Sequence, residues 1–153
     1  MNIIIVDDDT LVTEALKTIL ESSGKVTVTA TGSDGTDAVR LYKKFKPDIL
    51  LTDIQMKEMS GLDATKEILS FDNTAKILLL TTFLDDEYIV TALKYGAKGY
   101  ILKQDYTAIV PALEAVYSGQ SVFGTEIISK LPELLNKKHE FDYSDYDINE
   151  REL

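Results

Sequence analysis

Four short runs of apolar residues in this sequence each stop abruptly at a polar residue. The runs are residues 3–6, 48–53, 77–80 and 99–102, and their ends carry Asp7, Asp53, Thr81 and Lys103. Continuous apolar segments of this length, separated by longer helical patterns, are typical of strands in a parallel sheet that is buried on both faces. The sequence therefore predicts an α/β fold.

The polar strand ends are expected to lie together. All strands of a parallel sheet point the same way, so their carboxyl ends share one edge, where open α/β folds bind ligands. We therefore expect Asp7, Asp8, Asp53, Thr81 and Lys103 to meet at that edge.

Helical patterns fill the intervals between the runs, which makes five β-α units and a five-stranded parallel sheet with helices on both faces. Asp9 or Thr10 is expected to cap the first helix, and Ser33 or Asp34 the second. Residues 25–30 alternate valine with threonine, which indicates a strand near the edge of the sheet.

Composition narrows the function. The 153 residues suit one domain with an appendage, and the formal net charge of −10 disfavours binding to nucleic acid or anionic membranes. There is no cysteine, which excludes disulfides and thiolate zinc sites. No apolar run approaches the roughly 18 residues of a membrane span, so we expect a cytoplasmic protein without a membrane partner.

The grouped side chains suggest a chemistry. Carboxylates without nearby nitrogen or sulfur donors suit Mg²⁺, and their mutual repulsion should raise the pKa of one of them. A lysine and a hydroxyl at the same edge could hold phosphoryl oxygens, which favours phosphoryl transfer. Asp53 stands alone at its strand end and is the natural acceptor, which leaves Asp7 and Asp8 to hold the metal.

Each of these residues also has an ordinary structural interpretation. Paired acids after a strand often only cap a helix, and a single polar residue at a strand end is usually just solvated. It is their joint occurrence that favours a functional site. The glycine-rich fingerprints of nucleotide-binding loops are absent from the sequence.

Over residues 1–118 the chain resembles the receiver domain of bacterial two-component response regulators. The resemblance rests on Ile3–Asp8, Asp48–Asp53 followed by Met56 and Gly61, the strand ending at Thr81, and Ala92–Lys103. It implies the flavodoxin-like receiver fold.

The resemblance also implies roles at the site. Asp53 matches the phosphoacceptor, Asp8 the principal Mg²⁺ ligand with Asp7 beside it, and Lys103 the phosphate-binding lysine. The backbone carbonyl of Gln55 would complete the protein ligands to the metal.

Two further positions match the family's conformational switch, with Thr81 as the switch hydroxyl and Tyr100 as the switch aromatic residue. The implied phosphoryl donor is a phosphohistidine on a sensor histidine kinase, and phosphorylation is expected to favour a homodimer. On this interpretation the protein is no enzyme beyond assisting its own Mg²⁺-dependent phosphorylation and dephosphorylation.

The C-terminal part has a different character. Residues 119–149 lack a sustained hydrophobic period and are interpreted as a linker with a short helix at 125–135. Residues 147–153 resemble the opening of a LuxR/NarL-type helix-turn-helix domain, which we expect to begin at about 150–153. We therefore expect a piece of a transcriptional regulator that contacts DNA only through a C-terminal domain absent from this chain.

The sequence departs from the family pattern in one loop and leaves two rival functions open. Lys57 follows Met56 where the family usually has proline, which predicts a more mobile loop.

A Mg²⁺-dependent phosphohydrolase would usually need a second acid two residues after its nucleophile, where this chain has Gln55. A degenerate receiver that serves only as a binding scaffold is disfavoured because every expected site residue is present. Gln55 and Phe83 lie near the expected path of an attacking water.

Overall fold

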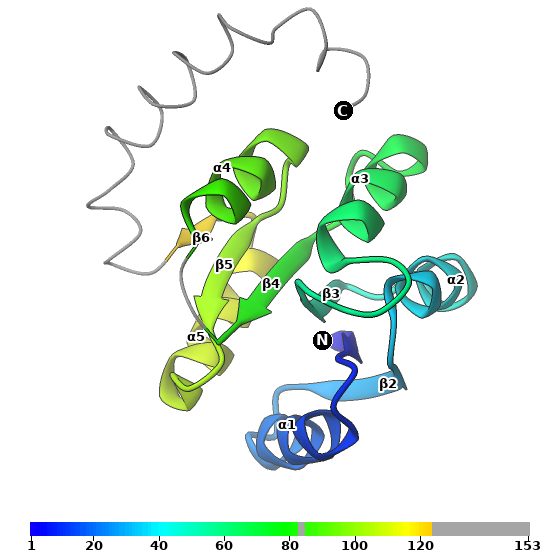
Figure 1. The fold of residues 1–153 in the computed structure, drawn as a ribbon. Helices are drawn as coiled ribbons and strands as arrows, with labels where there is room; N and C mark the ends of the chain where they lie inside the picture. Colours follow the sequence, from blue (N-terminus) through cyan, green and yellow to red (C-terminus); the bar gives the residue numbers. More distant parts are fainter. Residues whose placement is uncertain (83–84, 124–153) are drawn as a thin grey trace, which may run out of the picture.

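The predicted strands form one parallel sheet with the order β2-β1-β3-β4-β5-β6 (Figure 1). The computed structural model describes residues 1–82 and 85–123. The strands are β1 Asn2–Val6, β2 Thr27–Gly32, β3 Ile49–Asp53, β4 Ile77–Thr81, β5 Gly99–Leu102 and β6 Val122–Phe123. The predicted α/β class is confirmed, and β2 lies at a sheet edge as its alternating pattern indicated.

The sheet has one strand more than predicted. Val122 and Phe123 lie within the segment interpreted as a linker, yet they pair in parallel with Gly99 and Tyr100 of β5. The Val122 amide donates to the Lys98 carbonyl at 2.7 Å. Two residues are too few to show a period of two, so only the pairing reveals this strand. The predicted helix at 125–135 and the segment resembling a DNA-binding domain lie outside the described residues.

Helices cover both faces of the sheet (Figure 1). They are α1 Thr10–Ser22, α2 Gly35–Phe45, α3 Gly61–Phe71, α4 Asp86–Tyr95 and α5 Tyr106–Tyr117. Helices α1 and α5 pack on one face, where Leu16, Leu20, Ile109 and Leu113 meet strand residues such as Ile5.

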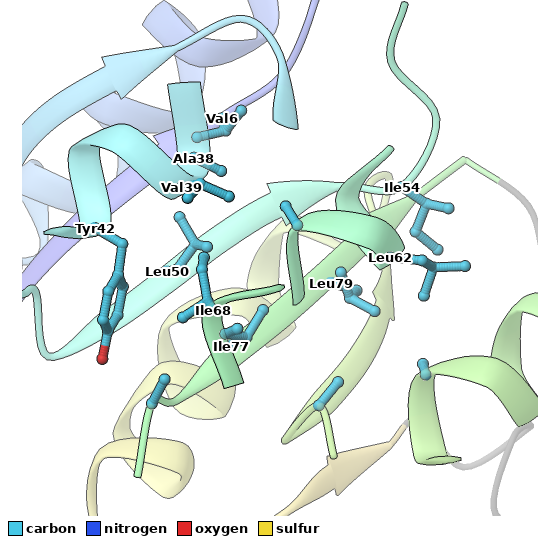
Figure 2. Packing of buried hydrophobic residues seen from close by; sticks show 14 of the residues in the cluster. Val6, Ala38, Val39, Tyr42, Leu50, Ile54, Leu62, Ile68, Ile77 and Leu79 are labelled. Carbon is cyan, nitrogen blue, oxygen red and sulfur yellow. The ribbon is translucent and has the colours of Figure 1, made fainter. Parts of the chain in front are cut away.

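Helices α2, α3 and α4 pack on the other face of the sheet. Their buried side chains, among them Ala38, Val39 and Ile68, contact Leu50 and Leu79 of the central strands (Figure 2). Consecutive residues of a strand point to opposite faces, so β1, β3 and β4 each supply both cores. This explains why their sequences are apolar without alternation.

Short polar side chains begin four of the helices. Asp9 caps α1 by accepting a hydrogen bond from the Leu11 amide, and Asp34 caps α2 by accepting one from the Thr36 amide. In each predicted pair of candidates the aspartate is the cap. Ser60 and Asp85 cap α3 and α4 in the same way. Within the ranges 1–82 and 85–123 we find no helix with the length and apolar character that crossing a bilayer demands.

Candidate functional site

The candidate site lies where the strand order reverses direction. The chain passes from β1 to the edge strand β2 and returns to the opposite side of β1 as β3. A crevice forms at the carboxyl ends of β1 and β3 at such a switch point. Asp7 directly follows β1, and Asp53 is the last residue of β3.

Three carboxylates converge there. Oxygen atoms of Asp7, Asp8 and Asp53 all lie within 4.8 Å of one another. Asp7 and Asp53 are buried, whereas Asp8 is exposed. Local backbone bonds orient the two buried groups, because Asp7 Oδ1 accepts from the Asp9 amide and Asp53 Oδ1 accepts from the Ile54 amide, each at 2.9 Å.

Lys103 joins two of these carboxylates. Its Nζ lies 2.5 Å from Asp7 Oδ2 and 3.3 Å from Asp53 Oδ2, and its side chain is only 17% exposed. The Lys103 amide donates to the Thr81 carbonyl at 2.6 Å, which anchors the lysine just beyond the end of β5. Burial acts to lower the pKa of Lys103, but the bond to Asp7 and the charge of Asp53 raise that pKa above its ordinary value.

The carboxyl group of Asp53 is unusually basic. Burial and the neighbouring charge of Asp7 raise the pKa of Asp53 to about 6, although Lys103 and the Ile54 amide act in the opposite direction. One carboxylate thus has the raised pKa that was expected from mutual repulsion, but burial contributes more to the rise than the charge of Asp7 does. A cation bound beside Asp53 would lower the pKa of this carboxyl group and so ionise it.

The donor set fits a hard divalent cation. Three carboxylates face one ammonium group, so two negative charges remain uncompensated if all are ionised. The three grouped ligands are carboxylates, without a histidine or cysteine among them. Oxygen donors with room for water are what Mg²⁺ prefers, so Asp7, Asp8 and Asp53 suit this ion.

Thr81 and Tyr100 lie on the two strands that follow β3 in the sheet. Thr81 is buried at the end of β4, which is the neighbour of β3. Tyr100 is completely buried in β5, and its hydroxyl lies near the Thr81 side chain and the Asp85 backbone. Burial raises the pKa of Tyr100 to about 12, so the phenol is neutral.

The loop between β3 and α3 passes beside the site. The Gln55 side chain donates to the Tyr88 hydroxyl on α4, so its amide group is directed toward that helix. At the other end of the loop the Gly61 amide donates to the Ile54 carbonyl at 2.6 Å. A Cβ on Gly61 would lie only 1.9 Å from the Asp53 carbonyl oxygen, so glycine is required by this close approach.

Sequence reasoning missed one residue that shapes this loop. Asp34 was expected only as a candidate helix cap, yet its carboxylate also accepts hydrogen bonds from the Glu58 and Met59 amides. The contact joins residues 24 and 25 positions apart. No local sequence pattern predicts such a contact. The sequence did identify Asp34 as a candidate helix cap, which is a residue whose carboxylate is oriented by the backbone.

Fold and site together define a class of protein: a doubly wound α/β domain with an acidic site at its switch point. The family model for the response regulator receiver domain matches residues 3–114. The chain therefore belongs to the response regulator receiver domain family, and the predicted resemblance is confirmed.

Curated relatives agree with this assignment. The chain is 36% identical over 160 residues to the oxygen regulatory protein NreC of Staphylococcus haemolyticus, covering 100% of this chain and 74% of that protein. It is 35% identical over 132 residues to the transcriptional regulatory protein DegU of Brevibacillus brevis, covering 86% of this chain and 56% of DegU. It also spans 61% of the Bacillus subtilis regulatory protein YxjL. The chain is thus shorter than these regulators.

Solved structures show the same fold. A LuxR family response regulator from Aurantimonas sp. SI85-9A1 superposes with a TM-score of 0.82 at 31% identity, covering 86% of this chain and 95% of that one. The isolated receiver domain of RcsB from Salmonella enterica serovar Typhimurium, determined with the phosphomimetic BeF3−, gives a TM-score of 0.76 at 26% identity. It covers 84% of this chain and 96% of its own.

Proposed function

We propose that this chain is the phosphoaccepting part of a transcriptional response regulator, with Asp53 as the acceptor. In this proposal Asp7, Asp8, Asp53 and the Gln55 backbone carbonyl hold Mg²⁺, and Lys103 binds the phosphoryl group. The observation that carries it is the cluster of three carboxylates within 4.8 Å, two of which Lys103 contacts.

The proposed transfer forms one bond and breaks one. A carboxylate oxygen of Asp53 attacks phosphorus with an electron pair, and the P–N bond of a phosphohistidine breaks, returning its pair to the imidazole nitrogen. Bound Mg²⁺ would supply positive charge near the phosphoryl oxygens. Lys103 would give a second cation, since its ammonium already lies 3.3 Å from Asp53 Oδ2. The site thus positions and neutralises charge, and needs no strong base.

The chain's membership of the receiver family supports the rest of the proposal, which concerns the phosphoryl donor, self-association and the control of transcription. The phosphoryl donor would be a sensor histidine kinase, and the phosphorylated form would associate as a homodimer through rearrangement of Thr81 and Tyr100. Control of transcription would pass through a DNA-binding domain of the LuxR/NarL type. Such a regulator would work in the cytoplasm.

A catalytic phosphohydrolase is the weaker alternative. Two residues after Asp53 the chain has Gln55, whose side chain is held by Tyr88 and offers no proton to a leaving group. We therefore infer that the protein turns over no external substrate, and that its chemistry is confined to its own acceptor.

Intact-mass measurement tests the proposal directly. Treatment with a small acyl phosphate and Mg²⁺ should add one phosphoryl group, and the addition should disappear in chelator and in Asp53→Asn. The matched control is Asp48→Asn, which makes the same change at the opposite end of β3, where Asp48 Oδ2 accepts from the Asn2 amide at 2.8 Å. Labelling of Asp53→Asn to the parental extent would refute the assignment.

A further inference from the structure

Asp34 lies outside the carboxylate cluster but connects α2 to the loop that follows Asp53. Its Oδ1 accepts from the Glu58 amide at 2.9 Å, and its Oδ2 accepts from the Met59 amide at 3.2 Å. The same Oδ2 accepts from the Thr36 amide at 3.1 Å and so caps α2. One carboxylate thus ties a helix N-terminus to a loop far away in sequence.

A second contact makes this connection reciprocal. The Gly35 amide donates to the Met59 carbonyl at 3.0 Å, so the loop also accepts a bond from α2. The approach is close, because a Cβ on Gly35 would lie 2.4 Å from the Met59 carbonyl oxygen. Asp34 and Gly35 therefore hold Met59 from both its donor and its acceptor side.

The loop is thereby held at its base and at its tip. At its start it is continuous with β3, and the bond from the Gly61 amide to the Ile54 carbonyl closes its base. At its tip the Glu58 and Met59 amides donate to the Asp34 carboxylate, their only side-chain acceptor within residues 1–82 and 85–123. Between the base and the tip lies Gln55, whose carbonyl is a proposed metal ligand.

We infer that Asp34 is a positioning residue for metal binding, which fixes the loop so that the Gln55 carbonyl is held toward the carboxylate cluster. The inference rests on the proposed function, because it assumes Mg²⁺ at that cluster. The hydrogen bonds that the Glu58 and Met59 amides donate to Asp34 restrict the loop backbone directly after Lys57.

The test measures Mg²⁺ affinity by titration calorimetry, without any phosphoryl donor. Asp34→Ala should weaken Mg²⁺ binding by about three- to tenfold, and hydrogen exchange of the Glu58 and Met59 amides should become faster. Asp34→Asn retains one acceptor oxygen and should fall between parent and alanine variant.

The matched control is Asp37→Ala. It removes the same charge from the same end of α2. Asp37 accepts hydrogen bonds from the Ser33 amide and from Arg40, and among the described residues it makes none to the loop. We expect its Mg²⁺ affinity within twofold of the parent. An equal loss in both alanine variants, or no loss in Asp34→Ala, would overturn the inference.

The result is separable from the proposed function. If the parent protein binds no Mg²⁺, the proposed function fails; if the parent binds and Asp34→Ala binds equally well, only the role of Asp34 fails. Should Asp34→Ala not fold in chelator, judged by circular dichroism, Asp34→Asn carries the test. An affinity for Asp34→Asn equal to that of the parent, together with unchanged exchange at Glu58, would then refute the inference.

Discussion

In the proposed function the chemistry of this domain is concentrated in the carboxyl group of Asp53, whose environment differs from that of an aspartate in water. Its side chain is 12% exposed, lies near the charge of Asp7, and contacts Lys103 at 3.3 Å. Burial and Asp7 outweigh Lys103, so the pKa rises to about 6. The folded protein without metal therefore holds this proton more tightly than the unfolded chain does.

This difference predicts a pH dependence of stability. Because the folded pKa is raised from 3.8 to about 6, the stabilising contribution is fully present below pH 3.8 and is lost as pH rises through about 6. Between pH 5 and pH 7.5 in chelator the parent should lose about 1 kcal/mol of unfolding free energy relative to Asp53→Asn. Urea unfolding of both proteins at the two pH values measures it. A parent-to-variant difference that does not change with pH would contradict the raised pKa.

Among the elements, the β3–α3 loop is the one on which the site most depends. It starts at Asp53, the proposed acceptor, passes Gln55, contacts Asp34 at its tip, and closes where Gly61 begins α3. The resemblance to the family predicts a more mobile loop because Lys57 replaces the usual proline, and this stays a prediction. In the structure main-chain hydrogen bonds and the Asp34 carboxylate hold the loop.

Gly61→Ala tests the close approach at the base of this loop. Helix propensity alone would favour alanine by about 1 kcal/mol. The added Cβ would lie 1.9 Å from the Asp53 carbonyl oxygen, and this clash should outweigh the gain in helix propensity. We expect the unfolding free energy to fall by about 2 kcal/mol, and Mg²⁺ binding to weaken because Asp53 must shift.

Gly24→Ala is the comparison variant for Gly61→Ala. Gly24 has open space around it but a φ of +76°, so alanine there should cost about 1 kcal/mol through the backbone alone. Its Mg²⁺ affinity should stay at the parental value. Parental stability and Mg²⁺ affinity in Gly61→Ala would show that the backbone yields easily and that the close approach is unimportant.

On the scale of the whole molecule, folding gathers charges that the unfolded chain separates. The chain carries a formal net charge of −10, and the fold brings three of its carboxylates within 4.8 Å. A cation that binds only the folded state must stabilise it, by RT ln(1 + [Mg²⁺]/Kd).

Added Mg²⁺ should therefore raise the melting temperature. At ten times Kd the stabilisation is about 1.4 kcal/mol, which corresponds to a rise of a few degrees for a domain of this size. Scanning calorimetry in Mg²⁺ and in chelator, with potassium chloride matching the ionic strength, separates binding from screening. Asp53→Asn should melt higher than the parent in chelator and gain less from Mg²⁺. The absence of any Mg²⁺ shift in the parent at tens of millimolar would mean that the carboxylates form no metal site.

Most of the architecture could be predicted because local patterns of apolar and polar residues specify the strands and helices. Strands buried on both faces must be apolar throughout, and helices that cover them must repeat apolar residues every three or four positions. Parallel strands then place their ends at one edge, so the sequence alone determined that Asp7, Asp53 and Lys103 would be close. It also indicated the family, through the order of these segments.

Only the tertiary structure decided the contacts between distant residues. Lys103 bridges Asp7 and Asp53, Asp34 bonds to the loop at Glu58, and Val122 adds a strand to β5. None of these contacts produces a periodic pattern in the sequence, because each involves a single side chain or a pair of residues. Its geometry is set by elements that come from distant parts of the chain. Local patterns report which face of an element is buried, whereas individual polar contacts depend on where the packed elements place each atom.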